Sequence, residues 1–172
     1  VITFAKGVTS GIVPFSGLIA SGPVAEVLMS RPDGFPVGHT FSGYPLGCAV
    51  GAEMIRVIED EGLLANAAAM GARLHDGLAR IAAGSAHVGD VRGRGLLAGI
   101  ELVDDRESLA PRTGATARVV AAARDERLLV YGCATRVGAR VMEAVMLAPP
   151  LNISEADVDL ILERLEGAIG AA

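Results

Sequence analysis

The sequence predicts an α/β fold, and three observations lead to this prediction. Apolar residues make up 51% of the 172 residues and charged residues 20%, which is enough apolar content for a buried core. Short runs rich in β-branched residues predict strands, and longer segments with apolar residues on one stripe predict helices. Clusters of Gly and Pro, such as residues 31–36, separate these segments. The length fits one ordinary domain or two small ones.

The first part of the chain predicts two strands and two helices, over residues 1–5, 15–20, 23–29 and 46–59. The first strand is apolar enough to be buried, and it ends at Lys6 and Gly7. Pro45 suits the first turn of the second helix, because a helix needs no N–H donor there. That helix is apolar over most of its circumference, so it is expected to be largely buried, with Cys48 as a small core residue.

The second part of the chain predicts strands and amphipathic helices in alternation. Its elements are a helix over 63–82, strands over 88–91 and 96–103, a helix over 115–127, strands over 128–131 and 144–147, and a final helix. Ser154 and Asp157 form a start to the final helix that is similar to a capping box. The pattern changes near Glu61 and Gly62, so the chain is expected to divide there.

The composition argues against several classes of function. The net charge is −5, aromatic residues make up 3% and there is no Trp, which argues against a nucleic-acid partner. Cys48 and Cys133 lie far apart and lack CxxC spacing, so neither a disulfide framework nor a zinc site is indicated, and no other group has metal-ligand spacing. No apolar run reaches the roughly 18 residues that would predict a membrane span.

The start of the chain also carries an expectation about its origin. The first residue is Val1 rather than Met, and it opens directly into a strand-like run without a recognisable signal segment. We therefore expect a soluble cytoplasmic protein, of which this chain is a piece cut from a longer one.

Lys6 is the only lysine among the 15 basic residues, and all the others are arginine. Lysine can lose its proton whereas arginine cannot, so a lysine retained alone suggests a role that arginine would not serve. At the end of a buried strand this amine would be partly desolvated, which lowers its pKa and frees its lone pair for Schiff-base formation with an aldehyde. The structural alternatives are chance and a lysine whose head reaches solvent at a strand end.

The loop over residues 38–45 is a second candidate site. It reads Gly-His-Thr-Phe-Ser-Gly-Tyr-Pro and leads directly into a helix. Hydroxyl groups and backbone N–H groups at a glycine-flanked helix entrance can bind an anion such as phosphate. The structural alternative is that Ser42 caps the helix.

Four segments of the chain, taken together, form a recognisable pattern. They are Thr3–Gly7 with Ser10, Gly11 and Pro14, then Gly38 with Thr40, Gly43 and Pro45, then Val88–Leu96, and finally Leu147–Leu151. In this order, across nearly all 172 residues, they resemble the class III aminotransferases, which use pyridoxal 5'-phosphate (PLP). The resemblance implies the fold-type I architecture of PLP-dependent transferases. Residues 1–61 would form the C-terminal portion of its large domain, and residues 62–172 its C-terminal small domain.

The resemblance also implies roles for two residues. Lys6 would form the Schiff base with PLP and then act as the base and acid that moves the proton between substrate carbon and cofactor. Thr40, with its own N–H, would bind the PLP phosphate of the neighbouring subunit, which implies a homodimer with shared active sites. The Asp, the aromatic residue and the Gly-rich loop that complete the family's cofactor site lie upstream in the family, so the chain alone is expected to be inactive.

The residues before Pro149 and Pro150 narrow the substrate class. Amino-acid-specific members of the family often carry an Arg there, whereas this chain has Met146 near that place. This departure is similar to the branch that acts on ω-amino acids or amines with pyruvate. In that branch an Arg on a mobile loop binds the substrate carboxylate, which Arg136 or Arg140 would do here through a bidentate contact. The alternative is that both are solvated loop arginines.

The favoured reading is a transaminase that moves an amino group from an amine or amino acid to a keto acid. Two other activities of the resembling group stay open, an aminomutase and a decarboxylating enzyme, because the residues that distinguish them lie largely upstream. A further alternative is a non-catalytic, truncated remnant that only dimerises or binds a partner.

Overall fold

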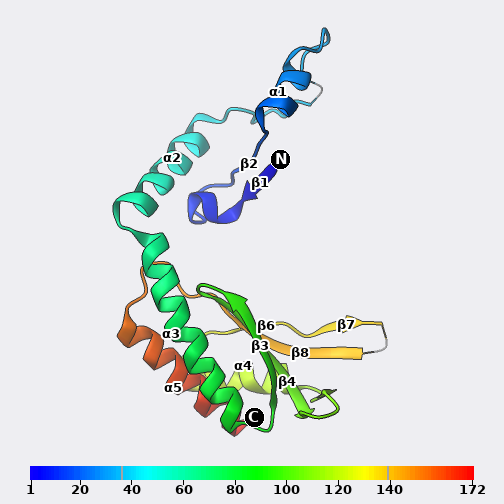
Figure 1. The fold of residues 1–172 in the computed structure, drawn as a ribbon, viewed down its shortest axis with the longest axis vertical. Coiled ribbons are helices and arrows are strands. Elements are labelled where there is room, and N and C mark those ends of the chain that lie inside the picture. The colour runs from blue at the N-terminus through cyan, green and yellow to red at the C-terminus, as the bar shows by residue number, and fades with distance from the viewer. Residues whose placement is uncertain (36, 139) are drawn as a thin grey trace. The chain divides into compact units, whose positions relative to one another are not determined.

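The computed structural model describes residues 1–35, 37–138 and 140–172, and it divides into two compact units, Val1–Gly62 and Leu63–Ala172 (Figure 1). Gly62 closes the first unit with φ +63°, in the left-handed region that only glycine adopts without cost. Its N–H donates to the carbonyl of Glu59 at 3.1 Å and so ends the preceding helix. Each unit combines strands with helices, as the predicted α/β fold class requires.

The first unit contains a two-stranded sheet, a short 3₁₀ helix and two α-helices. Its elements are β1 (Ile2–Ala5), η1 (Lys6–Thr9), β2 (Ser16–Ile19), α1 (Gly22–Met29) and α2 (Pro45–Asp60). Strands β1 and β2 are antiparallel, with a register that runs from the pair Ile2 and Ile19 to the pair Ala5 and Ser16. Both strands and both helices lie where the sequence predicts them, and the short 3₁₀ helix η1 follows β1 directly.

The predicted burial of this first unit is wrong. Helix α1 buries no residue, and α2 buries only Gly47 and Gly51. Cys48, which was expected in a core, is exposed. The physical reason is that two short strands and two helices give too few packed layers to enclose a core. The apolar side chains left exposed include Ile2, Leu18, Ile19, Val27, Phe41 and Ile55.

The second unit contains an antiparallel sheet in the order β3-β4-β8-β6, in which β5 pairs with β4 and β7 with β8. Its elements are α3 (Leu63–Gly84), β3 (Val88–Arg94), β4 (Leu97–Asp105), β5 (Ala110–Pro111), α4 (Ala115–Asp125), β6 (Tyr131–Gly132), β7 (Thr135–Val137), β8 (Arg140–Leu147) and α5 (Glu155–Ala171). The sequence predicts the three helices and the strands β3, β4 and β8, but it misses the two short strands β5 and β7.

The strand predicted over residues 128–131 is also wrong for most of its length. Arg127 has φ +61°, and the N–H of Leu128 donates to the carbonyl of Ala123 at 2.7 Å. This left-handed helix end directs Leu128 into the core, where only 9% of it is exposed. The apolar run therefore marks the end of α4, and strand pairing begins only at Tyr131.

The core of the second unit lies between the sheet and its helices. Helix α3 packs on β3, α4 packs on β8, and α5 packs on both α3 and α4 (Figure 1). The largest buried side chains come from all three helices and from three strands: Leu74, Leu78, Val88, Ile100, Leu102, Val119, Val145, Val158 and Leu165. This unit thus encloses its own hydrophobic core.

Helix α3 approaches the β3–β4 turn closely at Gly71. A Cβ atom added there would lie 2.5 Å from the carbonyl carbon of Gly95, nearer than real Cβ contacts come. Gly95 itself has φ +56° in the turn between the two strands. A glycine at position 71 is therefore required by backbone contact, although glycine weakens a helix interior.

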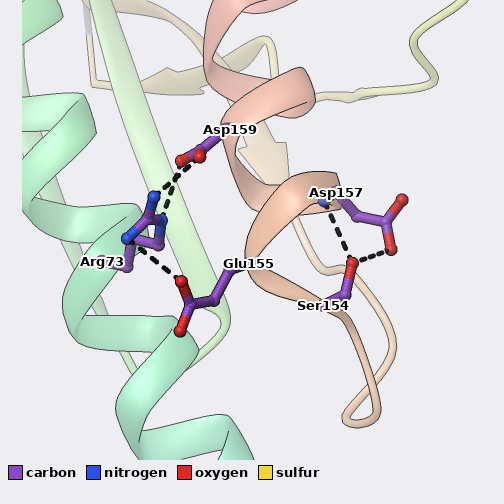
Figure 2. Close-up of polar contacts among 5 residues, drawn as sticks. All are labelled: Arg73, Ser154, Glu155, Asp157 and Asp159. Carbon is purple, nitrogen blue, oxygen red and sulfur yellow. Dashed lines mark hydrogen bonds and ion pairs between the residues drawn. The ribbon is translucent and has the colours of Figure 1, made fainter.

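Polar contacts connect α3 to the start of α5 (Figure 2). Arg73 donates from Nε and Nη2 to the two carboxylate oxygens of Asp159, at 2.8 and 2.7 Å, and lies 3.6 Å from Glu155. The hydrogen bond from Arg73 lowers the pKa of Asp159. Ser154 Oγ accepts the N–H of Asp157 at 3.2 Å, so the predicted capping contact is confirmed. Since the ion pair is solvent-exposed, it orients the two helices more than it stabilises them.

The contact at Gly71 yields a stability prediction. We expect Gly71→Ala to lower the free energy of unfolding by about 1–3 kcal/mol, because its methyl group would displace the backbone at Gly95. The matched control is Gly84→Ala at the end of the same helix, where an added Cβ meets nothing within 4 Å. Urea denaturation followed by circular dichroism measures both variants, and equal stability of the two would contradict the close approach.

Candidate functional site

An open cavity of about 1080 Å³ in the first unit brings two segments together. One segment is the turn from Ala5 to Ser16, and the other is the loop from His39 to Tyr44. The sequence had singled out Lys6 and this loop independently, and both line the cavity. Its wall also carries apolar side chains, including Val13 and Phe15.

Lys6 lies at the junction of β1 and η1, with its side chain exposed. The expectation that it ends a buried strand is wrong, because β1 belongs to an open two-stranded sheet and is mostly exposed itself. The backbone of Lys6 has φ +53°, which L-residues other than Asn and Asp rarely adopt. Holding a non-glycine residue there costs on the order of 1–2 kcal/mol. Such strain persists only where the surrounding structure fixes it.

Thr9 fixes the turn that follows Lys6. It is 1% exposed, and its Oγ1 lies 2.7 Å from the carbonyl oxygen of Val13, to which it donates. Two backbone contacts tighten the same turn: the N–H of Ser10 donates to Gly7, and the N–H of Ile12 donates to Thr9, both at 3.0 Å. Sequence reasoning missed Thr9, although a threonine placed three residues after the lysine was available as a signal.

Phe15 anchors the cavity wall on α2. A Cβ atom added at Gly47 would lie 2.7 Å from Cδ2 of Phe15, and one added at Gly51 would lie 3.4 Å from Cε1 of the same ring. The two buried glycines of α2 therefore make room for the aromatic ring. Phe4 of β1 lies next to it, with ring centroids 6.2 Å apart.

The loop before α2 is held by contacts of its own. The N–H of Ser42 donates to the carbonyl of His39 at 2.8 Å, and the N–H of His39 donates to Ser42 Oγ at 3.0 Å. No side chain caps α2 at Tyr44. The alternative that Ser42 caps the helix is therefore wrong, because its oxygen accepts within the loop instead. The Ser42 hydroxyl hydrogen is not used by these two contacts and can donate to a ligand.

Thr40 occupies a different position from its neighbours. All of these residues are exposed, but His39, Phe41 and Ser42 line the cavity with Lys6 and Thr40 does not. Its assignment to a phosphate held by another subunit stays a prediction.

The two candidate arginines belong to the second unit. Arg136 is exposed on β7, opposite Val141 of β8. Arg140 is the first residue of β8, and its side chain lies outside the described part of the structure. Met146 is half-buried in β8, opposite Gly99 of β4. The role of the arginines in carboxylate binding stays a prediction.

Glu143 anchors β8, the strand that begins at Arg140, to the start of α4. It is 5% exposed, and its carboxylate accepts the N–H of Gly114 at 2.9 Å and of Thr116 at 3.0 Å. Burial acts to raise the pKa of Glu143, but the hydrogen bonds from Thr116 and Gly114 outweigh it, so the pKa is lowered. Sequence reasoning missed this residue, because nothing local to it indicates that it faces a helix start.

The described residues contain neither a metal-binding cluster nor a membrane-spanning helix. Within them no group of three or more His, Cys, Asp or Glu side chains is arranged to hold a metal ion. In the same residues no helix is both long and apolar enough to cross a membrane. Both cysteines, Cys48 and Cys133, are free.

The known proteins that this chain is similar to are aminotransferases. The family model described as aminotransferase class-III matches residues 1–169. The chain is 37% identical to a taurine–pyruvate aminotransferase of Rhodobacter capsulatus over 173 residues, which cover 98% of the chain and 38% of that protein. It is 41% identical to acetylornithine aminotransferase 1 of Bordetella pertussis over 165 residues, 96% of the chain and 36% of that protein. The chain thus spans less than two fifths of the length of these curated relatives.

Solved structures give the same result. A Bacillus anthracis aminotransferase matches 99% of the chain with a TM-score of 0.90 and 32% identity, over 38% of its own length. An (S)-enantioselective ω-transaminase of Thermomicrobium roseum matches 98% of the chain with a TM-score of 0.85 and 37% identity, over 36% of its length. A PLP-bound amine transaminase of an uncultivated Pseudomonas species matches 98% with a TM-score of 0.86 and 29% identity, over 37% of its length. The fold expected from the resemblance is therefore confirmed.

The anchor at Glu143 yields a prediction about pH. We expect Glu143→Gln to lower the free energy of unfolding at pH 7 by about 1–3 kcal/mol, because two buried N–H donors lose a charged acceptor. The pKa of Glu143 is lowered in the folded state, so its stabilising effect is present above the ordinary pKa of about 4.3 and is lost as the pH falls through the folded value.

The difference between wild type and Glu143→Gln should therefore shrink below about pH 4. Urea denaturation at a series of pH values measures it, with Glu163→Gln, an exposed glutamate on α5, as the control. A difference that stays constant down to pH 2–3 would contradict the assignment.

Proposed function

The chain belongs to the class III aminotransferases, and we propose that it supplies the cofactor-binding lysine of a PLP-dependent transaminase, Lys6. The observation that carries the proposal is the cavity in which Lys6, the only lysine, meets the loop from His39 to Tyr44. A family match alone would name the activity without saying which side chains perform it. The relatives are more than twice as long as this chain, so the activity is proposed for the whole protein and not for these 172 residues alone.

The residues around the cavity fit PLP. The group needs an amine partner for its aldehyde, donors for its phosphate and an apolar surface for its ring. Lys6 offers the amine, Ser42 and the loop backbone offer donors, and Val13 and Phe15 offer the apolar wall. When bound, PLP supplies an aldehyde that condenses with amines and a ring that withdraws electrons from the substrate carbon.

Lys6 would have two tasks in this reaction. Its Nζ must first be free of its extra proton, because only the neutral amine has a lone pair to donate. It then holds and releases a proton at Nζ, so that the same atom serves as base and as acid. The left-handed backbone at Lys6 fixes the direction in which its side chain leaves the turn. A fixed direction keeps Nζ near the reacting carbon.

Thr40 would bind phosphate in the site of a neighbouring copy. Two features support this part of the proposal. Thr40 is exposed and does not line the cavity of its own chain, although its neighbours on both sides do, so its hydroxyl is accessible to another partner. The first unit also exposes many apolar side chains, such as Leu18 and Ile19, which is typical of a surface that another chain covers. We therefore propose a homodimer with shared active sites.

The substrates proposed are an amine or ω-amino acid as donor and a keto acid such as pyruvate as acceptor. Relatives named taurine–pyruvate aminotransferase and ω-transaminase support this class. Met146 supports it as well, since it stands near the place where amino-acid-specific members often carry an Arg. Arg136 and Arg140 are the proposed partners of a substrate carboxylate, through bidentate contacts.

The role of Lys6 is tested by chemical trapping. The longest natural form of the chain is incubated with PLP, reduced with borohydride and digested, and the modified peptide is identified by mass spectrometry. We expect a pyridoxyl mass on Lys6 and none in Lys6→Ala. Transamination in Lys6→Ala should fall by about 10²–10⁴-fold or more, since the proton-transfer group is lost. A label on another peptide, or activity retained in Lys6→Ala, would overturn the proposal.

The role of Thr40 is tested by PLP affinity. We expect Thr40→Ala to weaken PLP binding about 10–100-fold, because it removes a hydrogen bond to a charged phosphate. Thr40→Ser keeps the hydroxyl and should bind PLP as wild type does. Fluorescence titration measures both variants, and unchanged affinity in Thr40→Ala would rule out the phosphate contact.

Mixed dimers test whether the site is shared. If Lys6 of one copy works with Thr40 of the other, mixing Lys6→Ala with Thr40→Ala yields heterodimers in which one of two sites is intact. Activity should then rise above the sum of the separate variants. If each site is built within one chain, neither site of the heterodimer is intact, and mixing should restore nothing.

A further inference from the structure

We infer that Thr9 is a positioning residue for Lys6, and that its buried hydroxyl fixes the turn from which the lysine side chain leaves. The inference rests on the proposed role of Lys6 and extends it to a residue that lines no part of the cavity. Four observations support it: the burial of Thr9, its short hydrogen bond, the strained backbone at Lys6, and the packing of the same turn on α2.

Thr9 is one of very few buried residues in the first unit. In the described residues 1–35 and 37–62, only Thr9, Gly47 and Gly51 are classed as buried, so Thr9 is the one buried residue with a side chain. A buried hydroxyl is unfavourable unless it forms a hydrogen bond. Oγ1 of Thr9 lies 2.7 Å from the carbonyl oxygen of Val13 and 3.5 Å from that of Lys6. Since a hydroxyl has one proton, the shorter contact with Val13 takes it.

This hydrogen bond closes a turn of strained geometry. Lys6 and Ser10 have φ +53° and +50°, and Gly11 has φ +75°. A 3₁₀ helix as short as η1 has weak hydrogen bonds and does not hold such angles by itself. The Thr9–Val13 contact ties the last residue of η1 to the end of the turn, and Thr9 Oγ1 also lies 3.5 Å from the carbonyl oxygen of Lys6. Both contacts help to hold η1, whose first residue is Lys6, in this geometry.

The end of the turn, near Val13, is held by packing against α2. Phe15 comes two residues after Val13, and its ring packs against Gly47 and Gly51 of α2. An added Cβ at Gly51 would also come within 3.8 Å of the carbonyl oxygen of Val8, next to Thr9. The turn therefore packs on α2 at two places. The hydrogen bond from Thr9 to Val13 connects this fixed part of the turn to η1, which begins at Lys6.

Thr9 does not line the cavity, so its loss should affect catalysis through the placement of Nζ of Lys6. We expect Thr9→Val, which keeps the branched shape and removes the hydroxyl, to lower kcat about 10–100-fold. KM for the amino donor should change little, because the residues proposed to bind the donor are not moved. Thr9→Ser restores the hydroxyl and should return kcat to near the wild-type value.

A second readout does not use activity. In the longest natural form of the chain loaded with PLP, the rate of borohydride trapping at Lys6 and the visible absorption spectrum report the state of the lysine directly. Thr9→Val should change both, and Thr9→Ser should change neither. Ser10→Ala, which removes an exposed hydroxyl one residue further along, is the matched control and should behave as wild type.

The outcomes separate this inference from the proposed function. Labelling of Lys6 in wild type, with kcat, trapping rate and spectrum unchanged in Thr9→Val, would overturn the role of Thr9 and leave that of Lys6 intact. Failure of wild type to label at Lys6 would overturn both. If Thr9→Val does not fold, Thr9→Ala and Thr9→Ser decide the question. Equal defects in these two would show that the hydroxyl is not the feature that matters, and recovery only in Thr9→Ser would support the inference.

Discussion

The turn that begins at Lys6 contains one buried side chain, that of Thr9, whose hydroxyl donates to a backbone carbonyl within the turn. This turn holds Lys6 and Ser10 at positive φ and follows an exposed strand, so it depends on its own hydrogen bonds and on its packing against α2. The 2.7 Å contact from Thr9 to Val13 closes this turn, and Phe15 then seats it on the two glycines of α2. Glycine is unfavourable in a helix interior, but here the ring of Phe15 occupies the space that side chains at these two positions would fill. The two glycines lower the stability of α2, but they allow the turn that begins at Lys6 to pack against this helix.

The two units obtain their order from different sources. The second unit encloses a core from three helices and a sheet, and close contacts such as that between Gly71 and Gly95 fix how the helices approach the strands. The described residues of the first unit enclose no comparable core, and the order of this unit comes from turns, hydrogen bonds and pairs of aromatic rings. A reactive side chain on such a unit is easily reached by ligands, but it needs dedicated contacts to stay in one place.

The sequence predicts the elements of this fold well, since apolar spacing, Pro45 and the Ser154 cap are local signals. It predicts burial in the first unit poorly, because spacing reveals which face is apolar but not what covers that face. Leu128 shows the same limit, since an apolar run after α4 enters the core at a helix end instead of forming a strand. Lys6 and the loop before α2 are visible as motifs. Thr9 lies three residues after the lysine, but its burial and its contact with Val13 arise only in the folded turn. Glu143 acts through N–H groups 29 and 27 residues away, which no local pattern indicates.

The exposed apolar surface of the first unit and the proposed position of Thr40 have a common physical explanation. A monomeric protein rarely leaves side chains such as Ile2, Leu18 and Ile55 in solvent together. Relatives are more than twice as long as this chain. Segments of the kind that these relatives have in addition, or the second copy of the proposed homodimer, would cover such a surface. Under the proposed function a second copy also brings a threonine hydroxyl to the cofactor. Association would then bury apolar area and complete the site in one step, which ties catalytic activity to assembly.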